Sequence, residues 1–147
     1  DWLAEEGFRC DLDDDGDIHV RHEGRDVYIL LDAKDPAYVR FLVPDVWQCE
    51  GEDAERSVAL VVANSVNSSF KALKVSLRSN GNVYAAVELF LDGFEAFREV
   101  TPRCLDVLGA ASWEFRSRMR DAQQKANEEA AAARKALEAS QGDGGQP

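Results

Sequence analysis

The stretch LKVSLRSNGNVYAAVELFL, residues 73–91, decides the fold because it reads as two strands joined by a tight turn. Apolar residues alternate with other residues on both sides of the dipeptide Asn80-Gly81. Asparagine and glycine readily adopt the positive φ angles that a two-residue hairpin turn requires. The stretch therefore predicts an antiparallel β-hairpin.

Four more strands are predicted upstream of this hairpin. Alternating apolar and polar residues predict strands over 8–12 and 18–22, and the apolar density of 26–32 predicts a central strand. A further apolar stretch, 38–43, is expected to end at Pro44, because proline cannot donate a hydrogen bond to a neighbouring strand. Most of the sheet is therefore expected to come from the first third of the chain.

The periodicity then becomes helical. Between about 53 and 67, valines recur at the spacing of one helix face, and acidic residues at the start of this segment suit a helix N-terminus. A second helix is predicted after the hairpin, with an apolar stripe from Phe94 to Met119, and Pro102 is expected to kink or restart it. Beyond Asp121 the sequence becomes rich in alanine and charged residues, which predicts a projecting, fraying helix.

The charge is strongly acidic and unevenly distributed. The 147 residues carry a net charge of −11, and residues 1–56 hold 17 acidic and 6 basic side chains. Phosphate backbones require a basic surface, so we expect no nucleic-acid partner, and we interpret Arg116, Arg118 and Arg120 as the solvated face of a helix. No apolar run approaches the roughly 18 residues that a membrane helix needs, so we expect no membrane partner.

The cysteines indicate a reducing compartment. Cys10, Cys49 and Cys104 are odd in number and far apart, which fits neither a zinc site nor a secreted disulfide framework. We therefore expect reduced, partly buried thiols in a cytoplasmic protein.

The sequence lacks the residue groupings that catalysis needs. His19 and His22 fall in one predicted strand with their side chains on opposite faces, so they cannot act together on one substrate. There is no glycine-rich phosphate loop, no serine nucleophile elbow and no paired set of metal ligands. We therefore expect no catalytic residue, no cofactor and no enzyme.

An aspartate-rich segment raises the question of calcium binding. Asp11, Asp13 and Asp15 are spaced like the first ligands of an EF-hand loop, but the twelfth position is His22 instead of a bidentate carboxylate. Predicted strands also flank the segment where an EF-hand has helices. We therefore predict a hairpin turn over 14–17, with a cation site at the three aspartates as the alternative.

Both faces of the predicted sheet are apolar. We assign one face to the core, and it contains Val27, Ile29, Leu31, Val83, Ala85, Val87 and Leu89. The opposite face is the candidate partner-binding surface, and it contains Tyr28, Leu30, Leu42, Tyr84, Ala86 and Phe90. An antiparallel sheet with one solvated side should be polar there, so either the C-terminal helix or another chain must cover this face. The length of that helix favours the first alternative.

The middle helix carries a second candidate interface. Its outer apolar side chains, Val58, Leu60 and Val62, are expected to lie beside the face that packs on the sheet. Contiguous apolar surface of this kind usually marks dimerisation or partner binding. We therefore predict a dimer interface on this helix.

The order of segments resembles the YbjN family, also called bacterial sensory transduction regulators. The resemblance begins with DWLAEEGFRCDLDDDGDIHVRHEGRDVYILLDAKDPAYVRFLVPDVW, residues 1–47, and extends to about Arg120. It rests on the EEGF start, the DxDGDI and EGR turns, the aliphatic strand with its DxxDP exit, the Ala63-Asn64 pair and the VELFL strand.

The resemblance implies an α+β fold like that of type III secretion chaperones. Such a fold has a curved antiparallel sheet, here of about five to six strands, with a middle helix and a long C-terminal helix. The family-like domain would cover 1–120, followed by an Ala/Glu-rich helical extension over 121–141 and a disordered tail over 142–147.

The resemblance also implies a homodimer that binds extended segments of client proteins, and it supplies no catalytic residue. The leading hypothesis is therefore a non-enzymatic, chaperone-like or adaptor protein in bacterial regulation or stress. The alternative is a calcium- or ligand-responsive regulator that uses the aspartate turn at 11–17.

Overall fold

The computed structural model describes residues 2–14, 16–51 and 53–142. The predicted tail at 142–147 lies, apart from Gly142, outside the described residues. In chain order the elements are α1 (Trp2–Glu5), β1 (Arg9–Leu12), β2 (Ile18–His22), β3 (Arg25–Asp32), β4 (Asp35–Gln48), α2 (Asp53–Ser69), β5 (Leu73–Leu77), β6 (Asn82–Phe90) and α3 (Gly93–Gly142).

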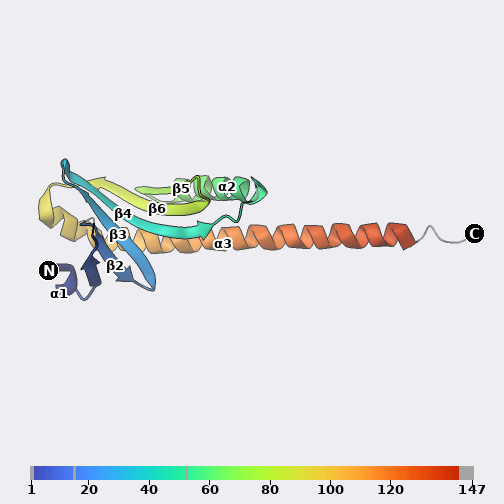
Figure 1. The fold of residues 1–147 in the computed structure, drawn as a ribbon, viewed down its shortest axis with the longest axis horizontal. Coiled ribbons are helices and arrows are strands. Elements are labelled where there is room, and N and C mark those ends of the chain that lie inside the picture. Colours follow the sequence, from blue (N-terminus) through green and yellow to red (C-terminus); the bar gives the residue numbers. More distant parts are fainter. Residues whose placement is uncertain (1, 15, 52, 143–147) are drawn as a thin grey trace, which may run out of the picture.

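The strands form one curved sheet of six, with every neighbouring pair antiparallel (Figure 1). The spatial order is β1-β2-β3-β4-β6-β5, because α2 separates β4 from β5 and the chain returns through β6 to pair with β4. The predicted hairpin over 73–91 is confirmed as β5 and β6, and the α+β fold class is confirmed with it.

The turn of this hairpin is wider than expected. Gly81 has a φ of 91°, whereas Asn80 does not adopt a positive φ. The Arg78 N–H donates to the Asn82 carbonyl at 2.8 Å and the Gly81 N–H donates to the Arg78 carbonyl at 3.0 Å, which closes a four-residue loop. The Asn80 carboxamide oxygen instead accepts from the Asn82 N–H at 3.1 Å.

Strand β4 continues past Pro44, so the expected end at this proline is wrong. The pairing of β4 with β6 shifts register between Val43 and Trp47, and Asp45 adopts a φ of 54° within the shift. A bulge of this kind tolerates proline, since residues inside it leave the regular ladder of hydrogen bonds. The Val46 carbonyl in the bulge accepts a 2.8 Å hydrogen bond from Arg116 Nε of α3.

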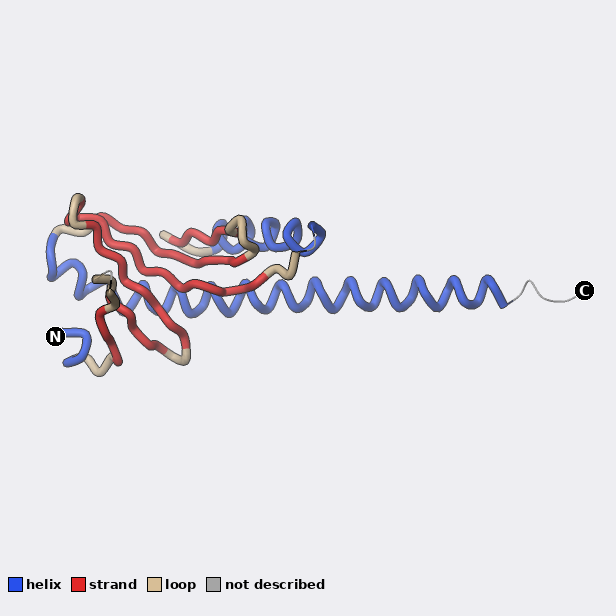
Figure 2. The backbone as a smooth tube through the Cα atoms, in the orientation of Figure 1, coloured by secondary structure: helices blue, strands red, loops and turns tan. Residues whose placement is uncertain are grey.

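Helix α3 passes through Pro102 without a restart. Its first turns run at an angle to the remainder (Figure 2), as expected where proline removes a hydrogen bond from the helix interior. The Thr101 hydroxyl donates to the Phe97 carbonyl at 2.7 Å in the same region. Between Asp121 and Ser140 the side chains are exposed apart from the half-buried Ala122, and the helix projects well beyond the sheet (Figure 1).

The core lies between the sheet and the helices α2 and α3, on the predicted core face. Phe41 of β4 is fully buried, and its ring stacks on Phe97 of α3 with 5.9 Å between centroids. The other large side chains that are fully buried are Phe115, Ile29, Leu105, Leu108 and Met119. Helix α3 therefore covers the core face, and the expectation that it covers the opposite face is wrong.

Most of the predicted core-face residues are confirmed, with one clear exception. Val27, Ile29, Val83, Ala85 and Val87 are buried and Leu89 is half-buried. Leu31 is instead 53% exposed, because the β3–β4 pairing shifts register between Leu31 and Asp32, at the end of that hairpin.

Helix α2 buries a different stripe from the valine stripe expected. Its buried residues are Ala59, Val62, Ala63 and Val66. Two small alanines therefore lie on the packed side, where Val58 and Val61 were expected. Val62 therefore belongs to the core, with 8% of its surface exposed, which excludes it from the dimer interface predicted for this helix. Val58 and Leu60 remain on the surface.

Gly81 and Gly24 offer a matched test of close packing at the hairpin turn. Both have positive φ, but an added Cβ meets nothing within 4 Å at Gly24 and meets the Cys49 carbonyl oxygen at 2.6 Å at Gly81. We expect Gly24→Ala to lower the free energy of unfolding by about 1 kcal/mol and Gly81→Ala by about 3 kcal/mol. Urea unfolding measures both values, and equal losses would contradict the close approach at Gly81.

Candidate functional site

The candidate site is the sheet face that points away from α2 and α3, which we call the open face. The six residues predicted for partner binding all lie outside the core cluster that the helices cover. Phe90 is 77% exposed, and Tyr28, Leu30, Leu42 and Tyr84 are half-buried. Ala86 is only 2% exposed, because larger side chains on the adjacent strands surround it.

Strand register brings three of these residues into one row. Tyr28 of β3 lies opposite Leu42 of β4, and Leu42 lies opposite Ala86 of β6. Directly opposed side chains on one face of a sheet are close enough to contact. The row therefore forms a continuous apolar strip across three strands. Tyr84 lies two residues before Ala86 on β6, on the same face, opposite Ser76 of β5.

A charged row runs beside the apolar strip. Arg40 of β4 lies opposite Glu88 of β6, with 3.4 Å between Nε and Oε1, and Lys74 of β5 pairs with the second carboxylate oxygen. Beyond this row Tyr38 contacts Phe90, with 5.8 Å between ring centroids. Sequence reasoning missed Tyr38, although its alternation with Arg40 along β4 would have placed it on this face.

His19 sits at the β1–β3 end of the open face between two carboxylates. Its Nε2 lies 2.9 Å from Asp26 Oδ1, its Nδ1 lies 3.3 Å from Asp11 Oδ2, and its ring stacks on Tyr28 at 5.0 Å. A neutral imidazole has only one N–H, so only the imidazolium can donate to both carboxylates. The hydrogen bond to Asp26 is the main cause of a raised His19 pKa, which desolvation opposes and Asp11 reinforces.

The aspartate-rich segment is a hairpin turn, as predicted. Strands β1 and β2 pair on either side of it, with Leu12 opposite Ile18, and the Asp17 N–H donates to Asp13 Oδ1 at 2.9 Å. Asp15, the third aspartate of the cation alternative, lies outside the described residues. Among the residues that are described, no group of three histidine, cysteine or acidic side chains is placed to hold a metal ion.

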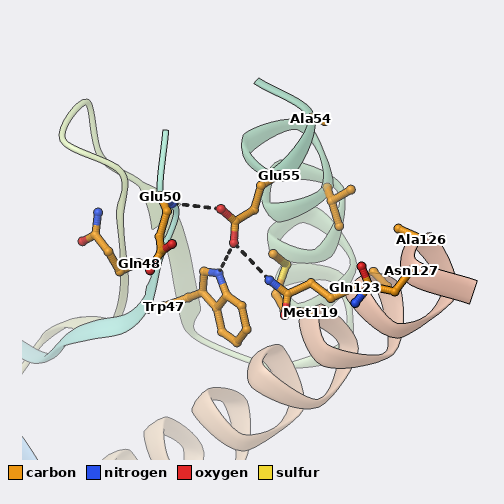
Figure 3. A pocket seen from close by; sticks show the side chains of 11 residues that line it. Trp47, Gln48, Glu50, Ala54, Glu55, Met119, Gln123, Ala126 and Asn127 are labelled. Carbon is orange, nitrogen blue, oxygen red and sulfur yellow. Dashed lines mark hydrogen bonds between the residues drawn. The ribbon is translucent and has the colours of Figure 1, made fainter. Parts of the chain in front are cut away.

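A pocket of about 660 Å³ lies where the end of β4 meets α2 and α3 (Figure 3). Glu55 of α2 crosses it, and its carboxylate accepts from Trp47 Nε1 at 2.9 Å, from the Glu50 N–H at 2.9 Å and from Gln123 at 3.4 Å. These bonds tie three elements together, so Glu55 has a structural role. The adjacent Cys49 is buried, and desolvation raises the pKa of its thiol, which disfavours a reactive thiolate.

Solved structures share this fold. No protein-family model matches the chain, and no curated protein matches it significantly. YbjN from E. coli, a candidate transcription regulator, superposes with a TM-score of 0.59 at 15% identity over 79% of this chain and 86% of that protein. An uncharacterized protein from Methanothermobacter thermautotrophicus gives 0.58 at 15% identity over 82% and 92%.

A third structure is more distant. The ExoU–SpcU complex from the type III secretion system of Pseudomonas aeruginosa gives a TM-score of 0.46 at 18% identity, over 77% of this chain and 93% of the matched chain. At these identities the likeness concerns the fold, and the chain has the YbjN-like fold that the sequence resemblance implied.

The stability of the β1–β3 region should depend on pH through His19. The unfolded pKa is near 6.5 and the folded pKa lies above it. The stabilisation is therefore complete below pH 6.5 and is lost as pH rises through the folded pKa. We expect the difference in free energy of unfolding between the wild type and His19→Asn to shrink from about pH 5.5 to about pH 9.

Two aspartate variants supply the control for this measurement. Asp26→Asn removes the principal partner of His19 and should abolish most of the pH dependence. Asp14→Asn removes one exposed charge from the neighbouring turn and should leave it unchanged. A wild-type to His19→Asn difference that stays constant across this range would contradict the bridging role of the imidazolium.

Proposed function

We propose that this chain is a non-enzymatic protein-binding module, a chaperone-like adaptor or regulator that holds a segment of a partner protein on its open face. The observation that carries the proposal is that α2 and α3 both pack on the other face of the sheet, while the open face keeps aromatic side chains in contact with solvent. Contiguous apolar surface that is left in contact with solvent usually marks an interaction site.

The chemistry of the open face suits a polypeptide. The half-buried Tyr28 and Leu42 would contact apolar side chains of the partner, whereas the buried Ala86 would not, and the row of Arg40, Glu88 and Lys74 offers both signs of charge to a partner's polar groups. Interfaces of this kind combine an apolar centre with a polar rim. The net charge of −11 favours a basic partner segment.

We place the protein in the cytoplasm and expect it to act without a cofactor. Cys10, Cys49 and Cys104 are all unpaired, in keeping with a reducing compartment. No helix in the described part of the chain is long and apolar enough to cross a membrane.

Introduction of two negative charges on the open face should abolish partner binding. We expect the protein with Tyr28→Asp and Tyr84→Asp to lose a partner that the wild type retains from lysate of its own source, because two carboxylates would be desolvated in the interface. Leu137→Asp, which changes an exposed leucine on the projecting part of α3, is the matched control and should keep the partner. Retention of every partner by the doubly substituted, folded protein would contradict the proposal.

We also propose a homodimer that forms through α2. Val58 and Leu60 are 36% and 56% exposed, and Val61 beside them is 70% exposed. Val58→Asp with Leu60→Asp should convert a dimer into a monomer in sedimentation equilibrium, while Tyr28→Asp with Tyr84→Asp should leave the dimer intact. A wild-type monomer at tens of micromolar concentration would refute this interface.

A further inference from the structure

A cluster of arginines lies on the helix side of the sheet, where the start of β3 meets α3. Arg25 alternates along β3 with the buried Val27 and Ile29, so its side chain points toward α3. Three residues of α3, Trp113, Arg116 and Arg120, follow one another at helical spacing on one stripe. We call Arg25, Trp113, Arg116 and Arg120 the arginine patch.

Arg25 is packed directly against the backbone of α3. A Cβ added at Gly109, one turn before Trp113, would lie 3.3 Å from Arg25 Nη1 and 3.7 Å from its Cζ. The side chain of any larger residue at position 109 would therefore press against the Arg25 guanidinium. Arg25 Nη1 pairs with the carboxylate of Glu23, in the β2–β3 turn, at 3.2 Å.

Arg116 is held beside it by the sheet. Its Nε donates to the Val46 carbonyl at 2.8 Å, and the side chain is half-buried. Burial is the first cause of a lowered Arg116 pKa, and the positive charges of Arg25 and Arg120 add to it. Arg116 follows Gly109, against which Arg25 packs, by seven residues, or about two turns of α3.

Arg118, on the same helix, differs from these residues because a carboxylate pairs with its charge. It points to the α2 side, where it donates to Glu114 at 2.7 Å and to the Ser65 hydroxyl. In contrast, neither Arg116 nor Arg120 forms an ion pair with a carboxylate anywhere in the described residues. The interpretation of Arg116, Arg118 and Arg120 as one solvated face is therefore wrong.

We propose that the arginine patch binds an acidic peptide segment of a partner protein, with an apolar side chain of that segment against Trp113. Trp113 is 64% exposed, and tryptophan and arginine are the residues that most often dominate protein interfaces. A concentration of positive charge in a chain of net charge −11 is complementary to a short acidic segment. A long polyanion such as DNA would extend beyond the patch over a chain of net charge −11 and be repelled.

The test is a titration of the full chain with the peptide Ac-EEEEFEEEE-NH2, followed by tryptophan fluorescence at low and physiological salt. We expect saturable binding that weakens with salt, and none with the glutamine peptide Ac-QQQQFQQQQ-NH2. Arg120→Glu should weaken binding about tenfold, since it reverses the charge of one of the two patch arginines that pair with no carboxylate among the described residues. Arg134→Glu makes the same charge change on the projecting part of α3 and should stay within about twofold.

Each other result would overturn the proposal. Equal weakening by Arg120→Glu and Arg134→Glu would show attraction by overall charge, and a lack of binding at millimolar peptide would show no site. Tighter binding of a DNA duplex, competing with the peptide, would assign the patch to nucleic acid. We expect the Tyr28→Asp, Tyr84→Asp protein to bind the peptide as the wild type does, because the patch and the open face lie on opposite sides of the sheet. Failure of one proposal can therefore be distinguished from failure of the other.

Discussion

The packing of α3 on one face of the sheet is the constraint on which the rest of the molecule depends. The buried side chains of α3 recur at alternating steps of four and three residues, through Leu105, Leu108, Ser112, Phe115 and Met119, so the helix presents a single apolar stripe. A helix with one stripe can cover only one face of a sheet. The open face is therefore left in contact with solvent. Helix α3 also projects beyond the last strand, because its apolar stripe gives way to alanine there.

The bulge in β4 links this packing to the curvature of the sheet. Pro44 and the left-handed Asp45 interrupt the pairing with β6, so β4 can bend and continue to Gln48. The interruption would leave a carbonyl at Val46 without a strand partner, and Arg116 supplies the missing donor. The same contact fixes one arginine of the patch in place, so a local defect of the sheet positions a charged side chain of the helix.

Local sequence patterns predicted the hairpins and the helices well, because each depends on short-range periodicity. In the aspartate segment turn chemistry and flanking alternation agree, whereas at Asn80-Gly81 the alternation predicted the hairpin but not its wider loop, in which Gly81 alone of the two has a positive φ. Alternation could not say which apolar face α3 would cover, since Tyr28 and Val27 lie on opposite faces and both are apolar. On α2 the valine pattern misled, because close approach to the sheet and α3 selects the small Ala59 and Ala63. The arginine patch joins Arg25 to residues about ninety positions away, so no local pattern could reveal it.

The electrostatics of the two candidate surfaces separate their roles. On the open face the charges of Arg40 and Lys74 converge on Glu88, which leaves one excess positive charge in this row, and the aromatic rings around it govern most of what the surface can hold. On the helix side neither Arg116 nor Arg120 pairs with a carboxylate in the part of the chain that the structure describes, so the arginine patch should attract acidic segments before contact. Because the sheet and α3 lie between them, one partner need not displace another. A chain that offered an apolar surface on one side and a cationic surface on the other could hold two different segments at once, which is the physical requirement for an adaptor.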